Sequence, residues 1–365
     1  MTEFLHPGVY LEELPSAVHP IEGVSTSTTG FVGEAADGPP GEAVRVTSLT
    51  EFERVFGGLQ QGVELGYAVL QFFSNGGREA WVVGAGTEQG VPAALGSFDS
   101  IGPLGLLSLP GWTDPKTLAA ALAWCDSRKT FLLVDSAGDD PQGARDVAAA
   151  LRGAGSPNAA VYFPWLLIGD PNDGGKPRLT PPGGTVAGVI ARTDIESGVF
   201  TAPAGERAQV LGVLGTGVDI DDAAAASLAE HGVNPIRSIP GKGMMIWGAR
   251  TVSSQEDWKY IPVRRLTLFL EDSLSRGLQW AVFEPNEEPL WIRLCLTVTA
   301  FLSGLWRQGA LHGEIPAEAY FVKCGRDVMA QADIDEGRVV ALVGFAPTRP
   351  AEFVLLRVVV QQPSA

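Results

Sequence analysis

Between residues 29 and 166, short apolar segments alternate with segments of helical periodicity. The apolar segments are TGFVGEA from Thr29, EAWVVGAG from Glu79, GLLSLPG from Gly105, TFLLVDS from Thr130 and AAVYFPWL from Ala159. Segments such as LGYAVLQFFSNGG and DPKTLAAALAWCDSR lie between them and have the apolar spacing of helices. Strands that are covered on both faces carry continuous apolar runs, and strand–helix alternation builds parallel sheets. The sequence therefore predicts an α/β domain with a mostly parallel sheet and helices on both faces.

Local signals predict where some of these elements begin and end. Thr50 and Glu53 have the spacing of a capping box, which predicts a helix beginning there. The sequence Asn75-Gly76-Gly77 is a typical end of the preceding helix. Residues 169–184, GDPNDGGKPRLTPPGG, are so rich in Gly and Pro that we expect an exposed irregular loop.

A second domain is expected after residue 240. Its sequence contains the segment WGART, a helix opened by Pro262, the connection EPNEEP, a helix opened by Pro289, and three apolar strands. The whole chain is thus α+β. We expect an extended N-terminal arm at 1–25, the α/β domain at 26–240, an α+β domain at 241–350 and a C-terminal strand arm at 351–365.

Two glycine-rich segments resemble nucleotide-binding motifs only superficially. Gly84, Gly86 and Gly90 follow a strand, but the last gap is four residues where a dinucleotide fingerprint needs three. In GDPNDGGKP, Gly175 occupies the position of the P-loop lysine, and Lys176 precedes a proline where the motif has Ser or Thr. We therefore expect no bound cofactor.

The sequence also lacks the residue patterns that hydrolases and metal sites need. The four histidines are His6, His19, His231 and His312, and none stands beside a candidate acid in a glycine-rich context. The sequence has no GxSxG or HExxH motif. Cys125, Cys295 and Cys324 form no CxxC pair and are predicted to be reduced thiols. We expect no catalytic residue and no metal, and a hydrolase on an α/β scaffold is the remote alternative.

The acidic charge lies almost entirely in the first domain. Of the formal net charge of −16, residues 1–240 contribute 13 Lys and Arg against 28 Asp and Glu, whereas residues 241–365 contribute 13 against 14. This balance disfavours nucleic-acid binding. Either the acidic residues serve solubility alone, or the neutral part faces another protein. The N-terminus lacks the pattern of a secretory signal, and no apolar run of about 18 residues predicts a membrane span, so we expect folding in the cytoplasm.

Both ends of the chain have strand patterns without an evident local partner. The N-terminal segment HPGVYLEEL alternates like a short strand, and PAEFVLLRVVVQQ near the C-terminus is strongly apolar. An unpaired strand of that length would promote aggregation, so we predict strand exchange between subunits. The residues predicted to take part are Val9, Tyr10, Leu11, Phe353, Leu355, Arg357 and Val359.

The helix opened by Pro289 carries a stripe of small residues with an arginine at each end. The stripe comprises Arg293, Thr297, Ala300, Gly304 and Arg307, opposite a face of large apolar residues. It is either an ordinary solvated face or a surface that lies flat on another protein. The helix Pro262–Gly277, with Arg264 and Arg265 near its start, is the alternative contact surface.

Several phrases of this sequence, in this order, resemble those of contractile tail sheath proteins. They are PGVY from Pro7, ARTD from Ala191 followed by AP, NPIRSIPGKG from Asn234, WGART from Trp247, and EPNEEP from Glu284. This family forms the outer cylinder of contractile phage tails, R-type pyocins and extracellular contractile injection systems. The phrases extend over nearly the whole chain.

The resemblance implies a structural function without catalysis. It implies a sheath subunit that assembles in the bacterial cytoplasm, stacks in six-membered rings around an inner tube, and contracts from a metastable extended state. It further implies a first domain of subtilisin-like fold without the triad, baseplate and cap proteins as partners, and terminal arms that complete a neighbour's sheet. Arg293, Thr297, Gly304 and Arg307 would then contact the inner tube, with no direct membrane insertion. A non-contracting paralogue near the baseplate or cap is the closer alternative.

Overall fold

The computed structural model describes residues 19–348 and 354–362, which form three sheets and the helices that pack on them. The main sheet has the order β11-β10-β6-β5-β4-β1-β3-β2. Its strands are β1 (Thr29–Gly33), β2 (Val44–Val46), β3 (Ala80–Gly84), β4 (Leu106–Ser108), β5 (Phe131–Asp135), β6 (Ala159–Phe163), β10 (Val233–Ile239) and β11 (Gly243–Ile246). The six central strands are parallel, and only the edge strands β2 and β11 are antiparallel. This confirms the predicted largely parallel sheet.

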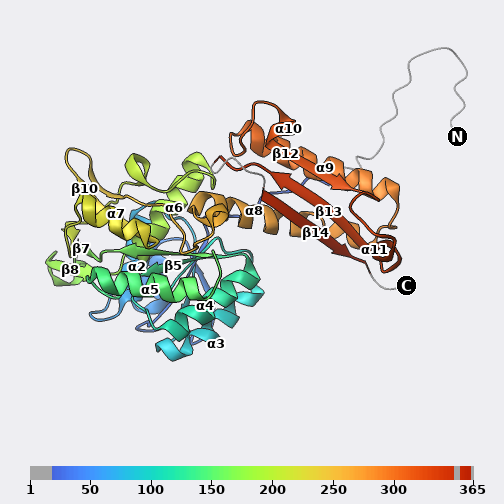
Figure 1. Cartoon of the computed structure of the whole chain (residues 1–365). Coiled ribbons are helices and arrows are strands. Elements are labelled where there is room, and N and C mark those ends of the chain that lie inside the picture. Colours follow the sequence, from blue (N-terminus) through green and yellow to red (C-terminus); the bar gives the residue numbers. More distant parts are fainter. Residues whose placement is uncertain (1–18, 349–353, 363–365) are drawn as a thin grey trace, which may run out of the picture.

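Helices cover both faces of the main sheet (Figure 1). One face packs against α1 (Leu49–Phe56), α2 (Glu64–Ser74) and α6 (Gly183–Ser197). The other packs against α3 (Val91–Gly96), α4 (Pro115–Arg128), α5 (Pro141–Gly153) and α7 (Asp222–Glu230). Because both faces are covered, every residue of β5 is buried, which explains its continuous apolar sequence FLLVD.

Two local expectations are corrected by the structure. Helix α1 begins at Leu49 with Ser48 as its N-cap, so Thr50 lies inside the helix and does not cap it. Residues 169–184 are not one irregular loop, because β8 (Pro177–Thr180) pairs antiparallel with β7 (Leu166–Gly169). Gly174 and Gly175 adopt φ of 63° and 82° in the connection, a region that glycine enters without steric cost. A third strand, β9 (Gly215–Thr216), completes this small sheet.

The C-terminal part has two long helices and an antiparallel sheet. The helices are α8 (Ile261–Gly277) and α9 (Glu288–Arg307), with the short helices α10 (Pro316–Ala319) and α11 (Gln331–Asp335) beside the strands. The sheet has the order β12 (Tyr320–Cys324), β13 (Arg338–Phe345), β14 (Val354–Gln361). Leucines of α8 and α9 pack on one face of this sheet and form the third hydrophobic core. The predicted second domain with two helices and a sheet is therefore present.

The first sheet extends beyond the boundary expected at residue 240. Strands β10 and β11 form a hairpin in which Ile236 pairs with Ile246 and Ile239 with Gly243. Met245 and Ile246 are fully buried. The hairpin thus keeps residues up to Ile246 with the main sheet.

Packing within the protein explains part of the apolar character of α9. By length and composition alone, with a mean hydropathy of 1.4, this helix is apolar enough to cross a membrane. Its Leu290, Leu294 and Val298 are buried in the core shared with the C-terminal sheet. A core helix can satisfy the same compositional test as a membrane span. The expectation of no span counted unbroken apolar runs only, so it did not detect this helix.

Candidate assembly surfaces and the interdomain junction

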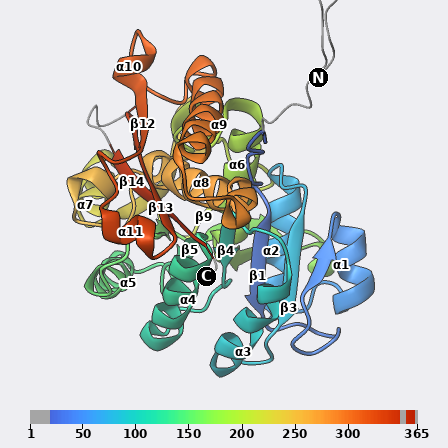
Figure 2. The ribbon, with the colours of Figure 1, turned by 90° about the vertical axis from the view of Figure 1, so that its right-hand side faces the viewer.

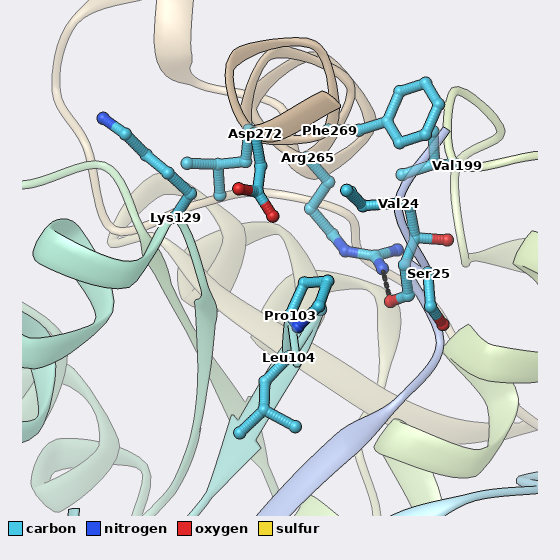
Figure 3. Close-up of a pocket in the computed structure, with 12 residues that line it drawn as sticks. Val24, Ser25, Pro103, Leu104, Lys129, Val199, Arg265, Phe269 and Asp272 are labelled. Atoms are coloured by element: carbon cyan, nitrogen blue, oxygen red, sulfur yellow. Dashed lines mark hydrogen bonds between the residues drawn. The ribbon is translucent and has the colours of Figure 1, made fainter. Parts of the chain in front are cut away.

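A buried ion pair joins the two domains at the start of α8. Arg265 donates from Nη1 and Nη2 to the two carboxylate oxygens of Asp194 on α6, at 2.8 and 2.7 Å. Its Nη2 also donates to the backbone carbonyl of Thr26 at 2.8 Å, which is drawn in Figure 3. Both charged side chains are only 3% exposed. A bidentate pair in such a site has a strict geometry, so it holds α8 in one orientation on the first domain.

Arg264, the preceding residue, is held by a second set of contacts. Its Nε donates to the side-chain oxygen of Asn158 at 2.6 Å, and its guanidinium lies 4.9 Å from the centre of the Trp258 ring. Glu271 lies two turns after Arg264 on α8. Its carboxylate approaches Arg264 at 3.7 Å and forms an ion pair with Lys129 of the first domain at 2.9 Å. Burial lowers the pKa of Arg264, and the Glu271 carboxylate opposes that shift.

These contacts make the two arginines of the alternative helix α8 unavailable to a partner. Arg264 and Arg265 are 9% and 3% exposed, so neither presents its charge to another protein. In the sequence, ARTD and the two arginines are separate features, and nothing in it predicts their pairing. Asp194 and Arg265 are 71 residues apart, and periodicity within either helix carries no information about that contact.

The stripe predicted on α9 is not one exposed face. Thr297 is 4% exposed and lies in the core, which removes it from any surface contact. Arg293 pairs with Glu284 and lies 5.3 Å from the centre of the Trp280 ring. Arg307 is exposed, and Gly304 is partly exposed.

The outward face of α9 is instead apolar over its first half. Ile292 and Leu296 are 53% and 63% exposed and are followed by the exposed Ala300 and Arg307. The exposed face begins about one residue before the predicted stripe. Since a helix turns by 100° per residue, this offset moves the solvent-facing side of α9 by about that angle. A group of exposed apolar side chains such as this one is typical of a surface that contacts another protein.

The strand β14 forms the edge of the C-terminal sheet. It pairs with β13 of the same chain from Val354↔Phe345 to Gln361↔Arg338. Residues 354–362 are therefore not a detached arm in this structure, which corrects the expectation that this strand has no partner in its own chain. Leu355, Arg357 and Val359 point their side chains away from the core, and Leu355 and Val359 are 58% and 47% exposed.

The outer edge of β14 is open within the described residues. The N–H of Gln362 donates to the carbonyl of Gly337, and antiparallel pairing alternates from there. Leu355, Arg357 and Val359 consequently direct their backbone N–H and C=O groups away from β13. A groove of about 670 Å³ runs along this edge between β14 and α8. Both features are what an added strand requires.

The remaining predicted exchange residues cannot be placed. Val9, Tyr10, Leu11 and Phe353 lie outside the described residues. Strand exchange accordingly stays a prediction, of which the structure describes only the receiving edge.

Two of the histidines make structural contacts. His231 follows α7 and its Nδ1 lies 2.8 Å from the backbone carbonyl of Ser227, while His19 stacks on Trp280. Among residues 19–348 and 354–362, no group of three or more His, Cys, Asp or Glu side chains is arranged to hold a metal ion.

Asp135, at the end of β5, is fully buried and accepts the backbone N–H groups of Gly183 and Gly111 at 2.6 and 3.0 Å. Burial raises its pKa to about 7, against the effect of those two N–H groups. Helix α6 begins at Gly183 without a side-chain cap from its own N-cap residue. Asp135 therefore caps α6 from a neighbouring strand.

Comparison with known families matches two adjacent parts of the chain. The phage tail sheath protein central domain matches residues 106–252, and the phage tail sheath C-terminal domain matches residues 253–361. The junction between the two matches follows the β10–β11 hairpin and precedes α8.

Solved structures and one curated relative agree with that match. The sheath of an extracellular contractile injection system, PVC, in its contracted state superposes with a TM-score of 0.81 at 30% identity, covering 98% of each chain. The contracted helical sheath of the anti-feeding prophage gives 0.78 at 32% identity, covering 96% of this chain and 98% of that one. The tail sheath protein of Vibrio phage KVP40 is 28% identical over 184 residues, which is 50% of this chain but only 26% of the relative. The chain thus matches about a quarter of that protein's length.

Proposed function

This chain belongs to the family of contractile tail sheath proteins, and we propose on that premise that it is the repeating subunit of a contractile sheath. The observation that carries the proposal is the likeness over 98% of both chains to a contracted injection-system sheath at 30% identity. Because both domains and their relative arrangement are shared, the likeness concerns the whole subunit.

The details of the assembly form the finer part of the proposal. The subunits would stack as six-membered rings around an inner tube, bounded by baseplate and cap proteins, after assembly in the bacterial cytoplasm. The extended form would be metastable, so that contraction releases free energy stored at assembly and needs no nucleotide. The subtilisin-like likeness of the first domain would be one of fold without catalysis.

Strand exchange would connect the subunits of this lattice. The support is the edge of β14 beside a groove, where Leu355, Arg357 and Val359 direct backbone groups away from β13 and find no partner among the described residues. We propose that the segment containing Val9, Tyr10 and Leu11 of another subunit adds to this edge. Backbone hydrogen bonds would provide the affinity, and the groove would accept alternate side chains.

The outward face of α9 is our proposed contact with the inner tube. Its exposed residues are Ile292, Leu296, Ala300 and Arg307. A small surface with few large apolar groups suits a contact that must guide assembly and later release. Arg293, which already pairs with Glu284, would act by orienting the start of this helix.

Electron microscopy with sedimentation tests the proposal directly. The purified full chain should form long cylinders, and a chain that lacks residues 1–18 should remain folded by circular dichroism but stay unpolymerised. Short rings from the full chain would favour the paralogue. A full chain that stays monomeric under all assembly conditions, or protease or esterase turnover that disappears in His231→Ala, would contradict the proposal.

A further inference from the structure

The segment that precedes β1 lies along one face of α8. Figure 2 shows this dark blue segment beside the helix, and the close-up in Figure 3 shows Val24 and Ser25 next to Arg265 and Phe269. The helix residues that it contacts are Arg265, Phe269, Ser273 and Gly277, which recur at intervals of four. Residues spaced by four share one face of a helix, so these contacts form a single continuous stripe.

Two of the contacts are hydrogen bonds to the backbone of the segment. Arg265 donates to the carbonyl of Thr26, and the N–H of Val24 donates to Oγ of Ser273 at 3.1 Å. Ser273 is fully buried, and its hydroxyl lies beneath the segment. Both bonds are made to backbone atoms, so they do not depend on the side chains at positions 24 and 26.

The other two contacts are close approaches at glycine residues. A Cβ at Gly23 would lie 2.7 Å from the Phe269 ring, and a Cβ at Gly277 would lie 2.8 Å from both Cγ atoms of Ile21. Ile21 is 9% exposed in this position. Gly277 has no positive φ, so its lack of a side chain serves the close packing of Ile21 and not an unusual backbone conformation.

The chain is thus held on the C-terminal domain before it enters the first domain as β1. His19, the first described residue, stacks on Trp280 with a centroid distance of 4.7 Å. The 18 residues that precede it can reach at most about 60 Å when extended. Their starting point is set by α8, on the same helix that borders the β14 groove.

We propose that this stripe of α8 is a seat that fixes where the N-terminal arm leaves the subunit, with Gly277 and Ser273 as positioning residues for strand exchange. The inference rests on the proposed function. If the seat is lost, the stretch between Leu11 and the next held residue grows from residues 12–18 to residues 12–27, because Gly105 and Leu106 still hold the Thr28 carbonyl. The effective concentration of the arm falls roughly as the −3/2 power of that length, about three- to fourfold here, and its exit direction is lost as well.

The test compares two glycines that each end a helix. Gly277→Val places a side chain where Ile21 packs, whereas Gly153→Val at the end of α5 enters open space, since nothing lies within 4 Å of an added Cβ there. Gly277→Val displaces the buried Ile21 and should unfold at a somewhat lower urea concentration than Gly153→Val, so assembly is compared where urea unfolding shows both variants to be folded. Only Gly277→Val should raise the protein concentration at which cylinders appear, by about three- to fourfold. Equal assembly thresholds for the two variants would overturn the seat.

A reversible cross-link tests whether the seat is kept in the polymer. An ideal Cβ at position 277 lies 3.1 Å from Cβ of Ile21, a few tenths of an ångström closer than in a disulfide, so Ile21→Cys with Gly277→Cys needs only a small shift. The cross-linked protein should polymerise at the threshold of the wild type. Polymerisation that occurs only after reduction would show that the segment must leave α8, which contradicts the proposal.

These outcomes separate the seat from the proposed function. If the wild type forms no cylinders, the sheath proposal fails before the seat is tested. If the wild type and Gly277→Val assemble alike, only the seat fails.

Discussion

At the scale of single residues, the buried charges of this subunit join parts of the chain that are distant in sequence. Arg265 and Asp194 connect α8 to α6, and Asp135 on β5 caps the start of α6. Each group is out of contact with water, so its partner determines whether its burial is tolerated. Asp194, the last residue of the family motif ARTD, thus has a structural function.

Replacing Arg265 or Asp194 should lower the free energy of unfolding more than breaking a surface ion pair does. Asp194→Ala leaves Arg265 charged and buried, and we expect the free energy of unfolding to fall by about 3–5 kcal/mol. Urea unfolding measures this. Arg45→Ala, which breaks the exposed pair with Glu79, is the control and should change stability little. Similar losses in the two variants would show that the junction pair is not energetically distinct.

Asp135 should make stability depend on pH. Its pKa rises from 3.8 to about 7 on folding, so the folded protein keeps a proton that the unfolded chain releases. The resulting contribution to stability is fully present below pH 3.8 and is lost as the pH rises to about 7. The difference corresponds to roughly 4 kcal/mol. We expect the wild type to lose stability relative to Asp135→Asn between pH 4 and 7, measured by urea unfolding. A constant difference between the two proteins would contradict this.

At the scale of elements, the two sides of β14 have separate functions. One side pairs with β13 and completes the sheet, and the other is an open edge. Removing the C-terminal residues would destroy both at once, because Leu356, Val358 and Val360 also pack on the third core. A variant that affects only the open edge is therefore more informative than a truncation.

Proline at position 359 provides such a variant. The N–H of Val359 points away from β13, so Val359→Pro removes an outward donor while the ladder bonds to β13 remain. We expect a folded subunit that no longer forms cylinders, judged by circular dichroism and electron microscopy. Val359→Ala keeps the N–H and should assemble. Cylinders at normal yield from Val359→Pro would exclude strand addition at this edge.

At the scale of the whole molecule, α8 belongs to both domains. Its Ile261 and Leu268 pack in the first domain, and its Leu266, Leu270 and Leu274 pack in the C-terminal core. A subunit built in this way should move as one body when a lattice rearranges, so that its contacts with neighbours change and its own fold does not.

This sharing of α8 predicts that the two domains unfold together. Native-state hydrogen exchange followed by mass spectrometry should give the same opening free energy for peptides from β5 and from α8. In Arg265→Ala the two opening free energies should differ, and that of the α8 peptides should be the lower one. Different opening energies in the wild type would mean that the domains are coupled only weakly.

The sequence by itself determined the kinds of element and their broad arrangement. Apolar runs between helical segments predicted the parallel sheet, and prolines at positions 262 and 289 predicted the starts of α8 and α9. These signals depend on neighbours along the chain, so they can be read without the fold. Phrases such as ARTD and EPNEEP identified the family for the same reason.

Only the tertiary structure decided which residues meet and which are exposed. It paired Arg265 with Asp194, buried Thr297, attached β14 to β13 and placed residues 21–26 on α8. A helical pattern gives the relative spacing of side chains, but the rotation of the helix against its neighbours depends on packing at distant positions. The contact surfaces of the subunit follow from that rotation, which is why the predicted stripe on α9 was displaced.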